Sequence, residues 1–383
     1  MELAQILREG MDRGASDFHL KPKQHAVLRV QGKLTPMDTI PPIELKDLDQ
    51  MAQGMMTPTQ RERYDREGGV DVQYSVAGVG RFRASICRSR GSVSLALRTV
   101  PYELPTFEEL HLPPVVAKLS MEPRGLVLVT GPAGSGKTTT LAAKINHMNQ
   151  LRNDHIVTIE DPIEYLHQDK NCIITQREVG TDTPSFADAL RICLRQDPDV
   201  IMVGEMRDVE TIRTVLTLAE TGHLVLSTLH TITAAETVNR IIAEFPGAQE
   251  RQIRGQLSQV LRGIISQRLI ERADGTGLLP AVEVLVSTGT IQRCIEDPAR
   301  TSQIPQAIAE GKDMYGMQTF DQCVLDFYQK QMITYEEALR ASSSPTDFEV
   351  EVQRLSMSQA AAPKPAAAAA PAPSKVAGRP PAR

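Results

Sequence analysis

The most informative segment of the chain is Gly131-Pro132-Ala133-Gly134-Ser135-Gly136-Lys137-Thr138. It matches G-x-x-x-x-G-K-[ST] in full. It also follows an apolar run at residues 126–130 and opens a helix-like segment, which is the context of a phosphate-binding loop. Glycines let backbone N–H groups surround the phosphates, and a helix N-terminus favours anions. We therefore predict that this loop and the next residue, Thr139, bind ATP. In this prediction Lys137 reaches the β- and γ-phosphates and the Thr138 hydroxyl ligates Mg²⁺.

The chain around this loop alternates between strand-like and helix-like segments. Short apolar runs, which favour buried parallel strands, occur at residues 126–130, 155–159, 199–203 and 224–228. The helix expected at residues 209–220 has apolar residues at i, i+3, i+4 and i+7, and a second helix is expected from Pro184 with Thr183 as its N-cap. This pattern predicts an α/β domain with a parallel sheet.

The residues before and after this domain differ from it in pattern. A helix is expected at residues 1–14, and strands at 26–30, 70–76, 80–87 and 92–100, which together favour a small α+β domain. Beyond about residue 287 the chain reads as mostly helical. The end of the chain is rich in Ala and Pro and favours disorder. We predict these boundaries: an N-terminal domain 1–105, a linker 106–124, an ATPase domain 125–348 and a disordered tail 349–383.

Composition argues against several classes of protein. The 383 residues carry a net charge of −5 and include no Trp, so a nucleic-acid-binding surface with aromatic stacking residues is not expected. No apolar run is long enough to span a membrane, and charged residues interrupt the first turns, so we expect neither direct membrane insertion nor a secretory signal. The five scattered cysteines predict reduced thiols in a cytosolic protein.

Carboxylates follow two of the expected strands. Glu205 ends the segment 199–205, and Glu160, Asp161 and Glu164 follow the strand at 155–159. Phosphoryl transfer to water needs a group that positions or deprotonates that water, and Mg²⁺ needs oxygen ligands. Because the carboxyl ends of parallel strands share one edge of a sheet, Glu205 and Glu164 are candidates for these roles. Asp161, which precedes a proline, is equally well explained as a residue that shapes the turn.

Histidine and arginine offer a second set of candidates, each with a simpler structural explanation. His230 follows the strand at 224–228, where it could sense a phosphate, although a lone histidine is more often structural. Arg81 and Arg83 are two residues apart on one strand, so they project from the same face. From spacing alone a solvated basic face is the simpler interpretation, and arginines offered to a neighbour's γ-phosphate are the functional one.

Four ordered motifs resemble those of the type II/IV secretion ATPases. They are the loop at 131–138, an acidic box at 155–165, a Walker B-like segment at 194–208 and a histidine box at 221–231. Within that family the chain is most similar to the motors of type IV pilus retraction and twitching motility, over residues 1–348. The resemblance implies a RecA-like P-loop ATPase domain preceded by a PAS-like domain, assembled into a homohexamer with ATP between subunits. It also implies an inner-membrane pilus platform protein as partner and a cytoplasmic protein that is peripheral at the inner membrane.

The same resemblance implies roles for individual residues. Glu205 becomes the catalytic glutamate, and Glu160, Asp161 and Glu164 line the site of Mg²⁺ and water, with Glu164, Glu205 and Thr138 near the metal. His230 becomes a γ-phosphate contact. The arginines that a neighbouring subunit would supply match Arg83 and Arg98 best, with Arg81 and Arg90 as weaker matches.

Alternatives within and outside the family stay open. Retraction ATPases resemble one another in a helix reading A-I-R-N-L-I-R-E, whereas residues 290–297 here read T-I-Q-R-C-I-E-D, which leaves an accessory retraction paralogue open. About 125 residues precede the P-loop and no tetracysteine zinc motif occurs, and both features disfavour a pilus assembly or secretion ATPase. A nucleic-acid translocase and a non-hydrolysing assembly module are the rival classes.

Overall fold

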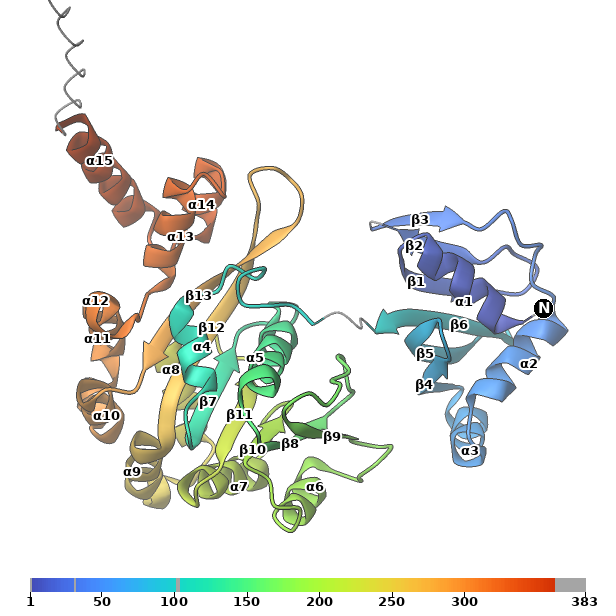
Figure 1. Ribbon diagram of the computed structural model, residues 1–383, viewed down its shortest axis with the longest axis horizontal. Coiled ribbons are helices and arrows are strands. Elements are labelled where there is room, and N and C mark those ends of the chain that lie inside the picture. The colour runs from blue at the N-terminus through green and yellow to red at the C-terminus, as the bar shows by residue number, and fades with distance from the viewer. Residues whose placement is uncertain (1, 31, 101–103, 362–383) are drawn as a thin grey trace, which may run out of the picture. The chain divides into compact units, whose positions relative to one another are not determined.

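The computed structural model describes residues 2–30, 32–100 and 104–361, with side chains described as far as residue 354. Its elements fall into two compact units, described separately here. The first comprises Met1–Ile270 and Leu278–Thr319, and the second comprises Glu271–Gly277 and the described residues from Phe320 onward. Figure 1 shows the elements of both units along the chain.

The N-terminal part of the first unit is built on an antiparallel six-stranded sheet in the order β3-β2-β1-β6-β5-β4. The helix expected at residues 1–14 is present as the first helix of this part, with Leu3, Ile6 and Leu7 buried. Phe18 meets Phe82 edge-on, with 5.7 Å between the ring centroids. The elements are α1 Leu3–Asp12, β1 Ala15–Leu20, β2 Val27–Val30, β3 Lys33–Pro36, α2 Leu45–Met55, α3 Pro58–Glu67, β4 Gly69–Val76, β5 Gly80–Ser89 and β6 Ser92–Val100.

The remaining part of the first unit is built on a seven-stranded sheet in the order β13-β12-β7-β11-β10-β8-β9. The elements are α4 Pro114–Ser120, β7 Gly125–Thr130, α5 Lys137–Leu151, β8 His155–Glu160, β9 Ile173–Glu178, α6 Phe186–Cys193, β10 Val200–Val203, α7 Val209–Glu220, β11 Leu224–Leu229, α8 Ala234–Ala243, the 3-10 helix η1 Gly247–Gln249, α9 Glu250–Val260, β12 Leu261–Glu271, β13 Leu278–Val286, α10 Gly289–Glu296, the 3-10 helix η2 Pro298–Gln303, α11 Ile304–Glu310 and α12 Lys312–Tyr315.

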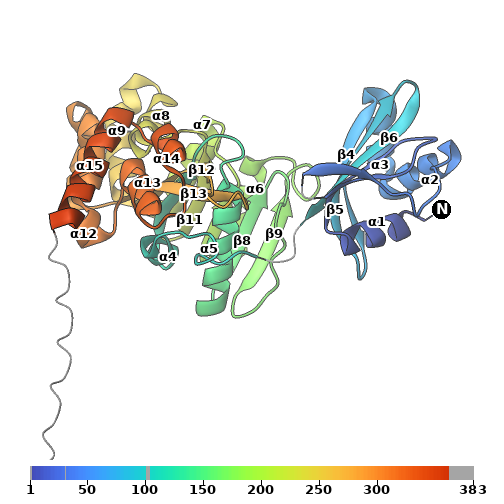
Figure 2. The ribbon, with the colours of Figure 1, turned by 90° about the horizontal axis from the view of Figure 1, so that it is seen from above.

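The expected parallel sheet is confirmed. β7 pairs in parallel with β11 and β12, β10 with β11 and β8, and β8 with β9. Helices α7, α8 and α9 lie on one side of the sheet and α4 and α5 on the other (Figure 2). Because both faces are covered, every residue of β7, β10 and β11 is buried, which explains why these strands read as unbroken apolar runs.

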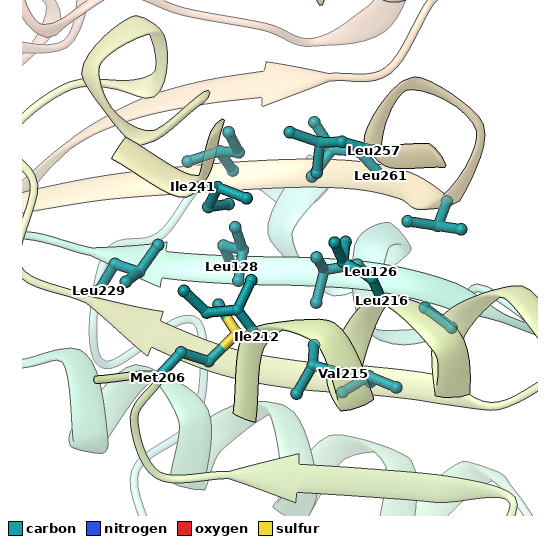
Figure 3. Close-up of a cluster of buried hydrophobic side chains, with 14 of the residues drawn as sticks. Leu126, Leu128, Met206, Ile212, Val215, Leu216, Leu229, Ile241, Leu257 and Leu261 are labelled. Carbon is teal, nitrogen blue, oxygen red and sulfur yellow. The ribbon is translucent and has the colours of Figure 1, made fainter. Parts of the chain in front are cut away.

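The core of the ATPase sheet joins β7 to the helices on one of its faces. Leu126 and Leu128 of β7 pack in one cluster with Ile212, Leu216 and Ile241 of α7 and α8 (Figure 3). A core of this kind fixes the central strand, and with it the start of the loop that follows β7.

One helix start differs from the sequence prediction. The helix after residue 180 begins at Phe186, and its N-cap is Ser185, whose hydroxyl accepts a hydrogen bond from the Asp188 N–H. Thr183, the predicted cap, instead donates its hydroxyl to the Ser185 carbonyl at 3.2 Å. The prediction was therefore wrong by two residues: hydroxyl residues flank Pro184 on both sides, and the hydroxyl of Thr183 is bound to the Ser185 carbonyl instead of capping the helix.

The second unit consists of Glu271–Gly277 with α13 Phe320–Gln329, α14 Tyr335–Ala341 and α15 Pro345–Ala361. Tyr328 contacts both Tyr335 and Phe348, with ring centroids 5.8 and 6.2 Å apart. The disordered tail was predicted from residue 349, but α15 continues through residue 361, since the buried Phe348 anchors its first turn. The rest of that predicted tail, 362–383, lies outside the described residues.

Two further expectations concern the whole chain. All five cysteines are free thiols, in agreement with the prediction. Within the described ranges, no helix combines the length and the apolar character that crossing a membrane would require.

Candidate nucleotide-binding site

The loop at residues 131–138 joins the C-terminal end of β7 to the N-terminus of α5. Gly131, Gly134 and Gly136 adopt positive φ values of 144°, 77° and 85°. A Cβ atom on Gly131 would lie 2.2 Å from the carbonyl oxygen of Gln267, so a side chain does not fit there. The buried Ser135 hydroxyl finds no hydrogen-bond partner within the described residues. A glycine cradle with an unsatisfied donor at a helix N-terminus suits a bound phosphate.

Lys137 is the first residue of α5, and its ammonium turns back over the loop. Its Nζ donates to the carbonyl oxygens of Gly131 and Pro132, both at 2.9 Å. Burial lowers the pKa of Lys137, while the nearby carboxylates of Glu205 and Glu164 oppose this shift. The side chain therefore lies over the cradle as a partly desolvated cation, which strengthens its attraction for a phosphate.

Gln267 on β12 hydrogen-bonds to the loop and to the first turn of α5, and it was not predicted from the sequence. Its side-chain amide donates to the Ser135 carbonyl at 2.7 Å and accepts from the Thr140 hydroxyl at 2.8 Å. The residue is 2% exposed. A glutamine within the strand-like run of β12 is the signal that could have identified it, because a buried amide needs partners.

Glu205 and His230 follow neighbouring strands, β10 and β11, and the structure brings both to Lys137. Glu205 Oε2 lies 3.4 Å from His230 Nε2, and His230 Nδ1 lies 3.5 Å from Lys137 Nζ. The other carboxylate oxygen of Glu205 pairs with Arg207, which sequence reasoning did not identify. The predicted cation, base and phosphate contact thus form one cluster.

Glu160 ends β8, next to β10 in the sheet. Burial raises the pKa of its carboxyl to about 7, although hydrogen bonds from Thr158, Gln176 and the backbone N–H of Glu164 favour the ionised form. Glu164 itself is exposed in the loop that follows. The carboxyl of Glu160 is therefore desolvated, whereas the carboxyl of Glu164 is exposed to solvent.

A pocket of ≈ 270 Å³ lies at this edge of the parallel sheet. It is lined by Ala133, Gly134, Lys137, Thr138, Leu141, Glu160, Asp161, Pro162, Glu164, Phe186, Met202, Gly204, Glu205, Arg207, Thr228 and His230. Thr139, which was predicted to bind the nucleotide, is absent from this lining, and its hydroxyl lies 3.0 Å from the Tyr165 hydroxyl. Most of the predicted nucleotide and carboxylate residues therefore share one cavity.

No group of three His, Cys, Asp or Glu residues within the described ranges is arranged to bind a metal ion unaided. Mg²⁺ is normally bound by one or two carboxylates together with substrate phosphates. The Thr138 hydroxyl and the carboxylates of Glu164 and Glu205 line the same pocket and fit that mode of binding.

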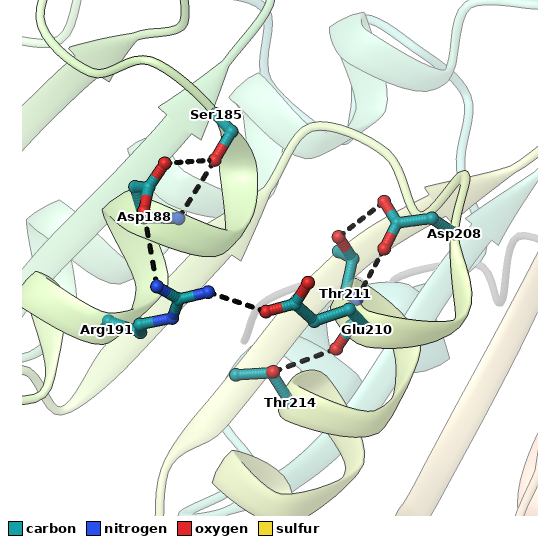
Figure 4. A network of polar contacts seen from close by, with 7 residues as sticks. All are labelled: Ser185, Asp188, Arg191, Asp208, Glu210, Thr211 and Thr214. Atoms are coloured by element: carbon teal, nitrogen blue, oxygen red, sulfur yellow. Dashed lines mark hydrogen bonds and ion pairs between the residues drawn. The ribbon is translucent and has the colours of Figure 1, made fainter.

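A polar network fixes the segment that carries Glu205. Asp208 caps α7 by accepting from the Thr211 N–H and hydroxyl, both at 2.8 Å. Arg191 of α6 pairs with Glu210 of α7 at 2.7 Å (Figure 4). Because Asp208 lies only three residues after Glu205, these contacts fix residues 204–208 at the start of α7.

Arg83 and Arg98, the arginines expected to reach a neighbour's nucleotide, do not line this pocket. They lie on β5 and β6 of the N-terminal sheet, directly opposite each other. Phe82, Ala84 and Ile86 of β5 are buried, so Arg81 and Arg83 lie on the other face of the strand, as their spacing predicted.

Comparison with known proteins agrees with this geometry. The family described as Type II/IV secretion system protein matches residues 2–344. The chain is 41% identical over 348 residues to the type IV pilus retraction ATPase PilT of Pseudomonas aeruginosa, covering 91% of this chain and all of that protein. It is 38% identical over 355 residues to the type IV pilus ATPase PilU of the same organism, covering 92% of each.

A solved structure of the pilus retraction motor PilT with bound ADP has the same fold. It superposes with a TM-score of 0.84 at 44% identity, covering 91% of this chain and 99% of the other. The P-loop, the carboxylates at the strand ends and the match over nearly the whole length agree with one another. The chain belongs to the type II/IV secretion ATPase family and is an ATP hydrolase with a RecA-like domain.

Proposed function

We propose that this protein is a homohexameric motor that hydrolyses ATP with Mg²⁺ to power type IV pilus retraction and twitching motility. The observation that carries this proposal is similarity to a retraction ATPase over that protein's entire length. The match includes the N-terminal sheet as well as the ATPase domain. The similarity therefore extends over both domains and is not limited to the P-loop.

The phosphates of ATP would bind in the glycine cradle, where backbone N–H groups and the N-terminus of α5 attract negative charge. The ammonium of Lys137 now donates to two loop carbonyls. With ATP bound it would donate to phosphate oxygens instead, and these charge-assisted hydrogen bonds are stronger. The Thr138 hydroxyl, with Glu164 and Glu205 near it, would bind Mg²⁺. When bound, that ion neutralises charge developing on the transferred phosphoryl group.

Glu205 is the residue we assign to activation of the attacking water. Its carboxylate ends a buried strand and faces the pocket beside His230, with only 13% of the side chain exposed. A carboxylate fixed in this way can accept a proton and orient a water. His230, which lies between Glu205 and Lys137, would contact the γ-phosphate.

Arg83 and Arg98 complete the proposal as groups supplied by a neighbouring subunit. A guanidinium near the transferring phosphoryl group stabilises its charge. If a neighbour provides it, hydrolysis depends on ring assembly, which is what a motor needs to couple successive subunits. We place the ring in the cytoplasm, peripheral at the inner membrane, where a pilus platform protein would receive the force.

An accessory retraction ATPase is the second candidate, and two observations favour it. The identity to PilU, at 38%, is close to the identity to PilT. In addition, α10 carries the stretch Thr290-Ile-Gln-Arg-Cys-Ile-Glu-Asp297, whose charges differ from those typical of retraction ATPases.

A deletion strain of the source organism separates these candidates. Loss of the principal retraction motor should raise the number of surface pili and stop twitching, and wild-type protein but not the Glu205→Gln variant should reverse both effects. Loss of an accessory paralogue should leave pilus number near normal and reduce twitching only partly. Unchanged piliation and motility would contradict a role in retraction altogether.

A further inference from the structure

The segment that carries Glu164 has no regular secondary structure. It leaves β8 after Glu160 and runs through residues 161–170 before the chain enters β9. A segment of this kind needs external hydrogen bonds to fix its backbone. Asn149 of α5 bonds the backbone of Gln168 and Lys170, and two side chains of β9 bond the part of the segment around Glu164.

Gln176 makes three of these contacts with a single amide group. Its Nε2 donates to the Tyr165 carbonyl at 2.9 Å and to the Glu160 carboxylate at 3.1 Å. Its Oε1 accepts from the backbone N–H of His167 at 2.8 Å. One side chain thus binds the segment on the C-terminal side of Glu164 and a carboxylate that lines the nucleotide pocket.

Glu178 binds the same segment on the N-terminal side of Glu164. Its Oε2 accepts from the Ile163 N–H at 3.0 Å, and its Oε1 accepts from the Thr181 hydroxyl at 3.1 Å. Contacts to Ile163 and Tyr165 therefore bracket Glu164 directly.

The strand register explains why these two side chains act together. β8 and β9 are parallel, with Thr158 paired to Gln176 and Glu160 paired to Glu178. Residues two apart on a strand project from the same face, so Gln176 and Glu178 lie beside Thr158 and Glu160. β9 is the last strand of the sheet, and its side chains on this face meet the carboxylate segment.

We propose that Gln176 is a positioning residue for ATP hydrolysis, which orients the Glu160 carboxylate and fixes the backbone on which Glu164 lies. This inference rests on the proposed roles of Glu160 and Glu164 in the site. A link to the P-loop helix strengthens it, because the Tyr165 hydroxyl lies 3.0 Å from the Thr139 hydroxyl of α5. Gln176 therefore connects the carboxylates to the nucleotide-binding element.

The test replaces Gln176 with Leu, which keeps the approximate size of the side chain and removes its polar atoms. Misplacement of groups around a reacting centre by about 1 Å costs about 10²-fold in rate. We expect kcat of the full-length protein to fall by about 10- to 100-fold. The affinity for ADP, measured by direct binding, should change by less than about threefold, because the phosphate cradle is untouched.

The division of the effect between kcat and KM supplies a readout that a purely structural role would not give. Gln176 does not line the nucleotide pocket, whereas Glu160 and Glu164 do. Both Gln176→Leu and Gln176→Glu should therefore lower kcat and leave the KM for ATP near the wild-type value. The carboxylate of Gln176→Glu can still accept from the His167 N–H, but it cannot donate to the Tyr165 carbonyl or to the Glu160 carboxylate, so it should not restore activity.

Thr175→Val is the matched control on the same strand. It removes a hydrogen bond of β9 to His155 Nε2, at 2.9 Å, that does not reach the carboxylate segment. It should leave kcat and the KM for ATP near those of the wild type. If Gln176→Leu behaves like Thr175→Val, or if Gln176→Glu retains the wild-type kcat, the inference is wrong.

Glu164→Gln, measured in parallel, separates the inference from the proposed function. An inactive Glu164→Gln protein beside a normal Gln176→Leu protein would overturn the inference alone. A fully active Glu164→Gln protein would overturn the proposed role of Glu164 itself, whatever Gln176 does.

Discussion

Arg83 lies directly opposite Arg98 on the neighbouring antiparallel strands β5 and β6. Like charges in this arrangement are unfavourable unless a counter-charge is near. Asp17 supplies one to Arg98, whose Nε lies 2.8 Å from its carboxylate. Burial of Asp17 opposes its ionisation, but hydrogen bonds from Arg98 and Ser16 outweigh this and lower its pKa. Among the described residues Arg83 pairs with Asp71 at 3.8 Å, a longer contact than that of Arg98 with Asp17, which leaves Arg83 the less neutralised of the two.

That asymmetry makes Arg83 the better candidate to reach a neighbour's nucleotide, and a mixing experiment tests it. Arg83→Ala and Glu205→Gln should each be nearly inactive alone, since a trans guanidinium contributes about 10³–10⁵ in rate. In mixed rings some interfaces combine an intact Arg83 with an intact Glu205, so turnover should partly return. No recovery in rings shown to contain both proteins would mean that Arg83 acts within its own chain or is structural.

Lys137 and Glu205 should fail in different ways. Lys137→Ala removes the cation over the cradle and should weaken nucleotide binding and abolish hydrolysis. Glu205→Gln should still bind ATP, because the amide leaves the cradle intact, but should not turn over, because an amide cannot accept the proton. Direct binding and steady-state assays on both variants check this. Normal hydrolysis by Glu205→Gln would transfer the role of base to Glu164 or another group.

The buried Glu160 should make stability depend on pH. Burial raises its pKa from 4.5 to about 7, so the folded protein retains a proton that the unfolded chain releases. Its contribution to stability is therefore complete below about pH 4.5 and is lost as pH rises to about 7, over a range of up to about 3 kcal/mol. Relative to Glu160→Gln, the wild-type unfolding free energy should fall between pH 5 and pH 7.5. The exposed Glu62→Gln variant should show no such difference.

Lys144 should be a destabilising residue at neutral pH. Its side chain is fully buried, and its Nζ donates to the Val116 carbonyl at 3.1 Å. Burial lowers its pKa from 10.5 to about 7, so the stability it would contribute above pH 10.5 is lost as pH falls toward 7. Lys144→Met should raise the unfolding free energy at pH 7.5 by about 1–3 kcal/mol. The gain should shrink toward pH 10, and the exposed Lys118→Met should give none.

The P-loop, the parallel strands and the position of each candidate relative to a strand end could all be predicted from the residues alone. This was possible because the requirements are local. A cradle needs glycines at fixed spacing, as Gly131 and Gly136 show, and a strand buried on both faces needs an apolar run, as β7 shows. Glu205, Glu160 and His230 could be predicted to meet because parallel strands bring their carboxyl ends to one edge.

Which polar side chains support that site depends on how the strands pack. Gln267 lies 132 residues along the chain from Ser135, and Gln176 reaches Glu160 and Tyr165 from the neighbouring strand, 16 and 11 residues away. Nothing in their local sequence reports the contact, because a glutamine amide is satisfied by whichever backbone groups packing presents.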